Sequence, residues 1–347
     1  MARHKPVFAR YLQPHPYTAN FNLTDNCNSK CITCREWQKK SSNELRTEEL
    51  KDIFEQLSNT TIRNVNFGGG ELMLRQDISE LVEYASKLGF NVTIVTNGLL
   101  INQENARDLV CKGVRGVYVS LDGPEPVHDK VRGVKGAYQR TLIGLTAFAD
   151  LKQKTGNLKV NIAATIMKPT LPTLLHVVKL AEKLDISVSF NLVDSKPYFF
   201  NGIELKNLWI EETQKLDDTV NTLIAIKRQQ PSLISNSIQS LEYAKQYFRD
   251  PLRKDVPCLL GFIELFFGSR GDVYPCWATK AVGSTRERKL KNILSSDLYR
   301  SNLNDMWAKK CPGCSCGYIP NLDFQIPTFF KELLMLPKFT LERILSL

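Results

Sequence analysis

Hydrophobic and polar positions alternate in two textures between Tyr17 and Asp194. Short runs of β-branched residues are each followed by a longer stretch whose apolar residues recur with the spacing of one helix face. The pattern predicts strands at residues 18–23, 62–67, 91–96, 116–121, 159–166 and 188–193. It predicts helices at residues 47–57, 78–88, 103–111, 137–154, 171–184 and 211–228. Six strand–helix units in a row indicate an α/β fold with parallel strands and right-handed crossovers.

The predicted strands are apolar on both faces or nearly so, as in residues 92–95, which is typical of strands buried between two layers. This texture fits an open doubly wound sheet as well as a barrel. The choice between the two depends on where the chemically distinctive residues fall.

The chain changes character after the last predicted strand. Residues 195–257 are mostly helical, and residues 258–320 carry cysteines, glycines and turn residues instead of periodic helices, so we expect a boundary near residue 250. Residues 327–347 are apolar and aromatic; we expect a helix packed over the main domain, with weak contact to a membrane surface as the alternative. The expected units are an N-terminal extension (1–16), the main domain (17–230), a helical linker (231–257), a cysteine-rich domain (258–320) and an apolar helical segment (321–347).

Composition indicates a globular chain of the cytoplasm. The 347 residues are 43% hydrophobic, yet they include neither a run long enough to span a bilayer nor a signal peptide. The net charge of +10 is partly concentrated in residues 1–16 and 286–291, which we interpret as a solvated basic surface. The alternative is attraction to an anionic partner, such as a phosphorylated substrate, an acidic redox protein or a membrane. No nucleic-acid-binding motif accompanies the charge, so nucleic acid is not expected as a partner.

The nine cysteines are unevenly spread, and in a reducing compartment they are not expected to form disulfides. Cys111 stands alone in an apolar helical pattern and is expected to pack in the core. The others form two groups with the spacing of metal ligands. The groups are Cys27, Cys31 and Cys34, and then Cys258, Cys276, Cys311, Cys314 and Cys316.

The first group lies in one loop after the first predicted strand. Thiolates suit soft metals and iron–sulfur clusters, and three of them on one loop can hold three corners of a single cluster. A structural zinc site is the alternative. Zinc fits less well, because it favours paired C-x2-C knuckles with a fourth ligand nearby, and His15 is the only close histidine.

Further polar motifs follow the next three strands. A glycine run ends in Gly69, Gly70 and Glu71, where the backbone could approach a ligand closely and the carboxylate could accept hydrogen bonds from an ammonium group. Asn97 lies in an Asn-Gly pair, which is also a common turn. The fourth strand leads to Ser120 and Asp122, then to His128, interpreted as a structural turn residue, and to Arg132, which could pair with a carboxylate. Each motif is weak alone, but all fall at the carboxyl ends of consecutive strands, the functional rim of a βα barrel.

Together these motifs resemble the radical S-adenosylmethionine (radical SAM) superfamily. The resemblance implies a partial (β/α)6 barrel, open on one side, and a 4Fe–4S cluster held by Cys27, Cys31 and Cys34 with one iron left for S-adenosylmethionine. It implies contacts to that cofactor from Gly69, Gly70, Glu71, Asn97, Ser120, Asp122 and Arg132. Two positions depart from the family pattern: Thr33 replaces an aromatic residue, with Trp37 following the motif, and Leu72 replaces a proline.

The second cysteine group resembles the twitch and SPASM extensions of this superfamily. Five cysteines are enough for one auxiliary 4Fe–4S cluster, so the resemblance implies a twitch-type domain. Its expected ligands are Cys258, Cys276, Cys311 and Cys314, with Cys316 as a substitute or a free thiol. Zinc remains an alternative, and a more credible one here than at the first group.

The implied activity is reductive cleavage of S-adenosylmethionine to a 5′-deoxyadenosyl radical, which abstracts hydrogen from an unidentified substrate. A flavodoxin- or ferredoxin-like protein is the expected one-electron donor. Only 16 residues precede the first strand, which favours a small natural product or sugar-like metabolite over a ribosomal peptide or protein side chain. An electron carrier and a zinc-stabilised binding protein are the remaining alternatives. Asp194, Lys196 and Tyr198 are interpreted as ordinary loop residues rather than substrate-binding groups.

Overall fold

The computed structural model describes residues 14–39, 42–194, 205–253 and 258–310. Several sequence predictions fall outside these ranges: most of the N-terminal extension, residues Lys196 and Tyr198, the cysteines Cys311, Cys314 and Cys316, and the apolar segment 327–347. In the part that is described, no helix has both the length and the apolar character needed to cross a membrane.

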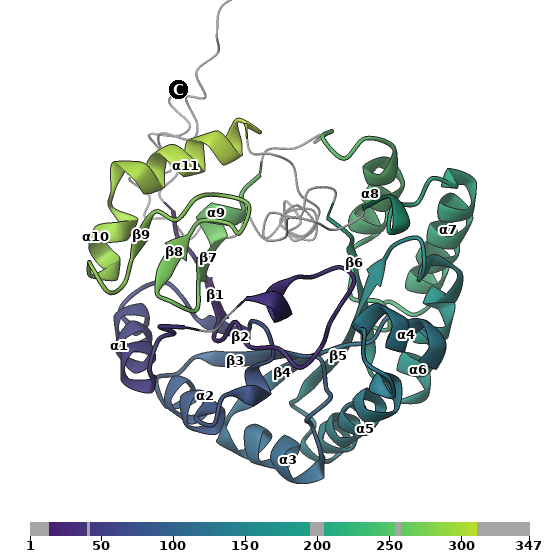
Figure 1. Ribbon diagram of the computed structural model, residues 1–347, viewed down its shortest axis with the longest axis horizontal. Coiled ribbons are helices and arrows are strands. Elements are labelled where there is room, and N and C mark those ends of the chain that lie inside the picture. Colours follow the sequence, from purple (N-terminus) through teal and green to yellow (C-terminus); the bar gives the residue numbers. More distant parts are fainter. Residues whose placement is uncertain (1–13, 40–41, 195–204, 254–257, 311–347) are drawn as a thin grey trace, which may run out of the picture.

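Six parallel strands curve around a common centre, with helices outside them (Figure 1). The strands are β1 (Thr18–Asn22), β2 (Asn64–Gly68), β3 (Asn91–Thr96), β4 (Val114–Ser120), β5 (Lys159–Ile166) and β6 (Ser187–Leu192). Each is hydrogen-bonded in parallel to its neighbour in the chain, so the order is β6-β5-β4-β3-β2-β1. The expected partial six-stranded barrel is confirmed.

The connecting helices cover the outside of the barrel (Figure 1). They are α1 (Thr47–Ser58), α2 (Ile78–Lys87), α3 (Gln103–Lys112), α4 (Glu125–Arg132), α5 (Ala137–Thr155), α6 (Leu174–Lys183), α7 (Thr213–Gln229) and α8 (Ile238–Arg249). Single 3-10 turns lie at η2 (Glu36–Gln38), η3 (Leu72–Leu74), η4 (Leu171–Thr173) and η5 (Leu205–Asn207).

The C-terminal region extends the barrel sheet. Its described elements are α9 (Leu260–Ile263), β7 (Glu264–Phe267), β8 (Asp272–Tyr274), β9 (Gly283–Ser284), α10 (Leu290–Leu294) and α11 (Asp297–Trp307). Strand β7 pairs in parallel with β1, and β8 and β9 follow in antiparallel order. Therefore β1 is an interior strand of a nine-stranded sheet whose edges are β6 and β9.

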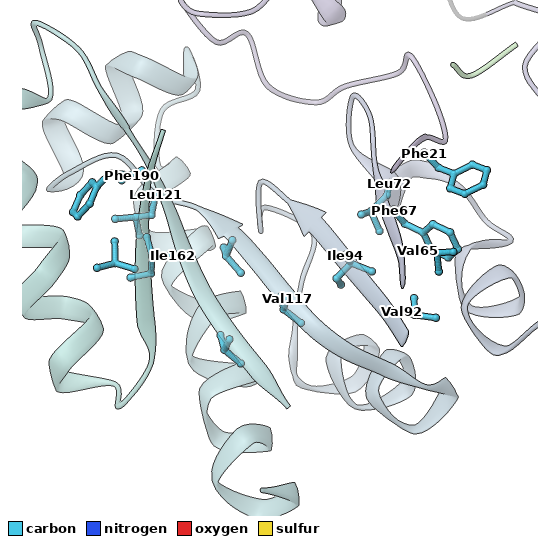
Figure 2. Packing of buried hydrophobic residues seen from close by; sticks show 14 of the residues in the cluster. Phe21, Val65, Phe67, Leu72, Val92, Ile94, Val117, Leu121, Ile162 and Phe190 are labelled. Carbon is cyan, nitrogen blue, oxygen red and sulfur yellow. The ribbon is translucent and has the colours of Figure 1, made fainter. Parts of the chain in front are cut away.

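The core lies between the strands and the helices. Alternate strand residues point outward into this layer, and Val65, Val92 and Val117 are at most 1% exposed (Figure 2). Phe21 stacks on Phe267 of β7 with ring centroids 4.6 Å apart, which joins the two regions through one hydrophobic cluster.

The inner faces of the strands correct the expectation of strands that are apolar on both sides. The inner positions of β1 and β2 are polar and only partly buried, as at Asn20 and Asn66. Some inner residues are apolar and yet exposed: Val95 is 41% exposed and Tyr118 is 38% exposed. Within the described ranges, the inner face of the strands is therefore less buried than the outer face.

Two single-residue predictions are wrong. His128 lies in α4 rather than in a turn; Pro124 precedes this helix, and Gly133 ends it in the left-handed conformation, with φ of 63°. Cys111 is exposed rather than packed in the core. It lies in α3, whose buried face is formed by Ala106, Leu109 and Val110, and the next residue along the helix points away from that face.

Candidate active site

The three-cysteine loop leaves β1 and crosses the mouth of the barrel (Figure 1). The backbone N–H groups of Lys30 and Ile32 donate to the carbonyl oxygens of Arg132 (2.8 Å) and Val131 (2.9 Å). The loop is thereby attached to the last turn of α4. The sequence-predicted Arg132 and the cysteines are thus brought together, although about a hundred residues separate them in the chain.

Asn97 attaches the same loop to the end of β3. Its side-chain amide Nδ2 donates to Asn28 Oδ1 (2.7 Å) and Ser29 Oγ (3.1 Å), and the residue is 8% exposed. Since two hydrogen bonds already engage this nitrogen, Asn97 acts on the site by holding the cysteine loop.

Gly69 and Gly70 also support the loop. A Cβ on Gly69, whose φ is +123°, would lie 2.1 Å from Asn22 Oδ1, and a Cβ on Gly70 would lie 2.1 Å from the carbonyl oxygen of Asn26. The N–H of Gly70 donates to the carbonyl oxygen of Thr24 (2.7 Å). The space left by both missing side chains is filled by the chain leading to the first cysteine. Glycine is therefore required here by packing of the protein on itself.

The three thiols lie in a partly dry environment with polar support. Cys31 is 8% exposed, and Cys27 and Cys34 are partly buried. The N–H groups of Ser29 and Glu36 lie 3.4 Å from the sulfurs of Cys27 and Cys34 respectively. Such donors stabilise thiolate ligands and tune an iron–sulfur cluster.

Burial raises the pKa of Cys34 to about 12, although the Glu36 N–H opposes the shift, and the neighbouring sulfurs of Cys31 and Cys27 raise it further. Burial and the adjacent Cys31 also raise the pKa of Cys27. Without a cation these thiols are protonated at neutral pH; bound iron would stabilise their anionic form. Among the described residues, no group of three or more histidine, cysteine, aspartate or glutamate side chains is arranged to hold a single metal ion.

Arg132 supplies positive charge beside the cysteines. Its Nη2 pairs with Asp122 Oδ2 at 2.7 Å, and its Nη1 lies 3.9 Å from Cys31 Sγ. Burial alone would lower the pKa of the guanidinium, but Asp122 and Cys31 outweigh it, and the pKa is raised. The buried Nε donates to no acceptor in the described part of the chain. An unused donor beside Cys31 fits an anionic ligand at the cluster.

Glu71 is turned into the protein. Its Oε1 accepts from Thr96 Oγ1 (2.7 Å) and the Met73 N–H (3.2 Å), and its Oε2 accepts from the Asn97 N–H (2.8 Å). It is 1% exposed, and burial raises its pKa against the effect of these donors. The carboxylate fixes the turn after β3, which in turn carries Asn97.

The remaining predicted residues line the end of β4. Ser120 is partly buried, and it is the register partner of Ala163 on the neighbouring strand β5. Asp122 is fully buried, and its Oδ1 accepts from the N–H of Thr165 (3.1 Å). His128 Nδ1 accepts from the N–H of Asp122 (3.2 Å); burial, with Arg132 nearby, lowers the pKa of His128 to about 4. His128 is therefore neutral and structural.

Sequence reasoning missed a cavity of about 300 Å³ below the loop. It is lined by Asn20, Phe21, Asn22, Glu36, Asn66, Gly68, Gly69, Val95 and Trp277. Polar residues at every second position of β1 and β2 were the available signal. The strands were predicted from their apolar positions, so the polar residues between those positions were not interpreted.

The second cysteine group is only partly described. Cys258 and Cys276 are 3% and 5% exposed, in a small hydrophobic cluster with Phe266 and Met306. The N–H of Ala278 lies 3.4 Å from Cys276 Sγ. The other three predicted ligands lie outside the described residues. Two buried thiols that lie on either side of β7 and β8 in the sequence, yet share one hydrophobic cluster, fit a shared metal centre.

Comparison with known proteins assigns both regions. Residues 21–181 match the model of the radical SAM superfamily, and residues 258–316 match the model of an iron–sulfur cluster-binding domain called SPASM. Fe-coproporphyrin III synthase of Methanosarcina barkeri is 35% identical over 207 residues, 58% of this chain and 49% of that protein. Mycofactocin maturase MftC of Mycolicibacterium smegmatis is 37% identical over 132 residues, 38% of this chain and 33% of that protein. The chain thus spans half the length or less of these curated relatives.

Solved structures share the fold. The crystal structure of SuiB from Streptococcus suis, bound to S-adenosylmethionine, superposes with a TM-score of 0.66 at 17% identity. The superposition covers 84% of this chain and 68% of that one.

Proposed function

Because this chain belongs to the radical SAM superfamily, we propose that it binds S-adenosylmethionine at a 4Fe–4S cluster held by Cys27, Cys31 and Cys34. When bound, the cluster supplies one electron that cleaves S-adenosylmethionine to methionine and a 5′-deoxyadenosyl radical, which abstracts hydrogen from the substrate. The observation that supports this most is one loop with three buried or half-buried thiols, attached to the barrel rim at β2, β3 and α4.

The residues of the chain have separate tasks in this proposal. Arg132 offsets the negative charge of the thiolates, and its unused Nε–H can donate to the carboxylate of S-adenosylmethionine. Ser120, partly buried at the end of β4, would contact the ribose. Glu71 and Asn97 hold the loop through hydrogen bonds within the protein.

We further propose that Cys258 and Cys276 ligate an auxiliary 4Fe–4S cluster together with cysteines among Cys311, Cys314 and Cys316. Burial beside Phe266 and Met306 would limit access of water and oxygen to such a cluster.

The substrate is proposed to be a small molecule, with a peptide as the alternative. Relatives of both kinds exist by name: an Fe-coproporphyrin III synthase and haem synthases, and SuiB, which has been crystallised with its precursor peptide SuiA. A flavodoxin- or ferredoxin-like protein is the proposed electron donor. Both the donor and the clusters suit the cytoplasm, which is the proposed location.

The test is anaerobic. The protein is reconstituted with iron and sulfide, supplied with S-adenosylmethionine and dithionite, and assayed for 5′-deoxyadenosine by chromatography. The variant with Cys27, Cys31 and Cys34 all changed to Ala is expected to form none, whereas Cys111→Ala, an exposed cysteine remote from the loop, keeps wild-type formation. A wild type that carries zinc and no iron would refute the proposal. Wild type that carries clusters but forms no 5′-deoxyadenosine, even with candidate substrates, would support an electron carrier instead.

A further inference from the structure

The cavity below the cysteine loop joins three strands to the C-terminal region. Asn20 and Asn66 form its wall from β1 and β2, Val95 adds an apolar face from β3, and Trp277 approaches from the segment after Cys276. Glu36 is the one charged side chain in the described lining, which contains neither lysine nor arginine.

The two asparagines form an ordered chain that ends in a carboxylate. Asn66 Nδ2 donates to Asn20 Oδ1 (2.8 Å), and Asn20 Nδ2 donates to Glu264 Oε2 (2.7 Å). Burial raises the pKa of Glu264, and the hydrogen bond from Asn20 opposes that shift. Since a carboxylate only accepts hydrogen bonds, Glu264 turns the amide nitrogen of Asn20 toward itself. The amide oxygen of Asn20 then faces Asn66 and orients the amide nitrogen of that residue.

This orientation leaves hydrogen-bonding capacity at Asn66. Its Oδ1 accepts no hydrogen bond from any other described residue, and its Nδ2 uses one of two N–H groups. One free acceptor beside one free donor matches the N–H and C=O of another amide. Glu36 Oε2 also receives no donor within the described ranges.

The part of the lining formed by Trp277 is apolar and packed against other rings. The indole of Trp277 lies edge-on to Phe266 with centroids 5.2 Å apart, and it lies 5.4 Å from the ring of Tyr274. A flat or apolar group can therefore pack on this side while a polar group meets Asn66. A carboxylate in the same place would lose its hydration and would approach Glu36. Within the described residues, the cation paired with Glu36 is Lys39, whose Nζ lies 2.6 Å from Glu36 Oε1 and is therefore already engaged.

We propose that Asn66, oriented by Asn20 and Glu264, is the residue that selects a substrate carrying an uncharged amide next to an apolar group and rejects one that presents a carboxylate. This inference rests on the proposed function, because it takes the cavity to be the place where the substrate meets the radical. The amide can belong to a small molecule or to a peptide.

Binding of paired probes tests the proposal. N-acetyl-L-phenylalaninamide and N-acetyl-L-phenylalanine differ only in an amide against a carboxylate. Their dissociation constants are measured by anaerobic equilibrium dialysis against the reconstituted full chain with S-adenosylmethionine. The amide is expected to bind about tenfold or more tightly than the acid. A capped peptide, acetyl-Gly-Gly-Phe-Gly-Gly-amide, distinguishes the sources: tighter binding than the single-residue amide indicates a peptide, and equal or weaker binding indicates a small molecule.

Variants localise the effect. Asn66→Leu keeps the size of the side chain and is expected to weaken amide binding about tenfold with little change for the acid. Asn91→Leu is the matched control, because Asn91 donates to Asn64 (3.1 Å) outside the cavity lining. Gly68→Val fills the cavity and should abolish binding of both probes; a Cβ there meets nothing nearer than 3.7 Å, so the fold should be kept.

Equal or tighter binding of the acid, or an Asn66→Leu variant with unchanged preference, would overturn the inference. Assaying 5′-deoxyadenosine in the same samples separates the two proposals. Its formation without the amide preference leaves the function standing and the inference refuted. An amide preference without 5′-deoxyadenosine leaves the binding preference of the cavity standing but refutes the proposed function, and with it the role of Asn66 in selecting a substrate for the radical.

Discussion

Gly70 offers a direct test of how the barrel positions the cysteine loop. A methyl group at this position would lie 2.1 Å from the carbonyl oxygen of Asn26 and 2.9 Å from that of Asp25. Both belong to the chain that leads into Cys27. The backbone of Gly70 has no positive φ, so alanine meets only the steric obstacle. We expect Gly70→Ala to push the loop away from the end of β2.

The size of the effect follows from this overlap. Carbon and oxygen in ordinary contact are more than 3 Å apart, so a backbone oxygen must move by about 1 Å; comparable overpacking costs about 1–3 kcal/mol. The Glu71 N–H to Asn26 carbonyl hydrogen bond (2.8 Å) would be strained as well. We therefore expect Tm to fall by several degrees and iron bound after anaerobic reconstitution to fall at least twofold.

Gly68→Ala is the matched control on the same strand end. Its Cβ would meet only Val95 Cβ at 3.7 Å and the carbonyl oxygen of Phe21 at 3.9 Å. Iron content and Tm should stay at wild-type values. If Gly70→Ala loads iron as well as Gly68→Ala does, the close contact with the loop does not position the cysteines, and the reasoning fails.

Three further predictions follow from buried or exposed groups. Asp122→Asn leaves Arg132 without its carboxylate partner and should cost about 3–5 kcal/mol, measured by urea unfolding; an unchanged midpoint would contradict the ion pair. The pKa of His128 in the folded protein is about 4, which is below its value in the unfolded chain. The unfolded chain therefore binds a proton first as the pH drops from about 6.5 to 4. Over that range the free energy of unfolding falls by at most about 1.4 kcal/mol per pH unit. His128→Asn should reduce that slope in Tm measured against pH. Cys111 should react first with iodoacetamide among the described cysteines, as peptide mass spectrometry would show; earlier modification of Cys258 would count against the burial pattern.

The repeating units of the barrel could be predicted from sequence because their signal is local. Each of the six strands lies within two residues of its predicted bounds at both ends. Burial under helices selects apolar residues at alternate positions, as at Val92 and Ile94, and a window of a few residues contains that information. The helix α4 was missed because it is short and its apolar face is narrow: within it only His128 and Val131 are buried.

The sequence predicted which residues belong to the site better than it predicted what each residue does there. Grouping the cysteines with Arg132 required only that parallel strands end on one rim. The tasks of Gly70 and Glu71 depend on what fills the space beside them, and those neighbours, Asn26 and Thr96, lie tens of residues away. No local pattern records such contacts. The cavity escaped for the same reason, since Asn20, Glu264 and Trp277 meet only after the C-terminal region has folded onto β1.

The pairing of β7 with β1 makes the C-terminal region part of the site. Four register pairs, from Thr18 with Glu264 to Phe21 with Phe267, place the buried carboxylate beside the start of β1. Removing this region would expose the edge of β1 and the ring of Phe21, an edge prone to pairing with other chains. It would also remove the acceptor that orients Asn20. A cluster ligated by Cys258 and Cys276 would therefore act on the cavity even without transferring an electron. Holding Trp277 in place fixes one wall of the cavity, and holding β7 in place fixes Glu264, the acceptor that orients Asn20.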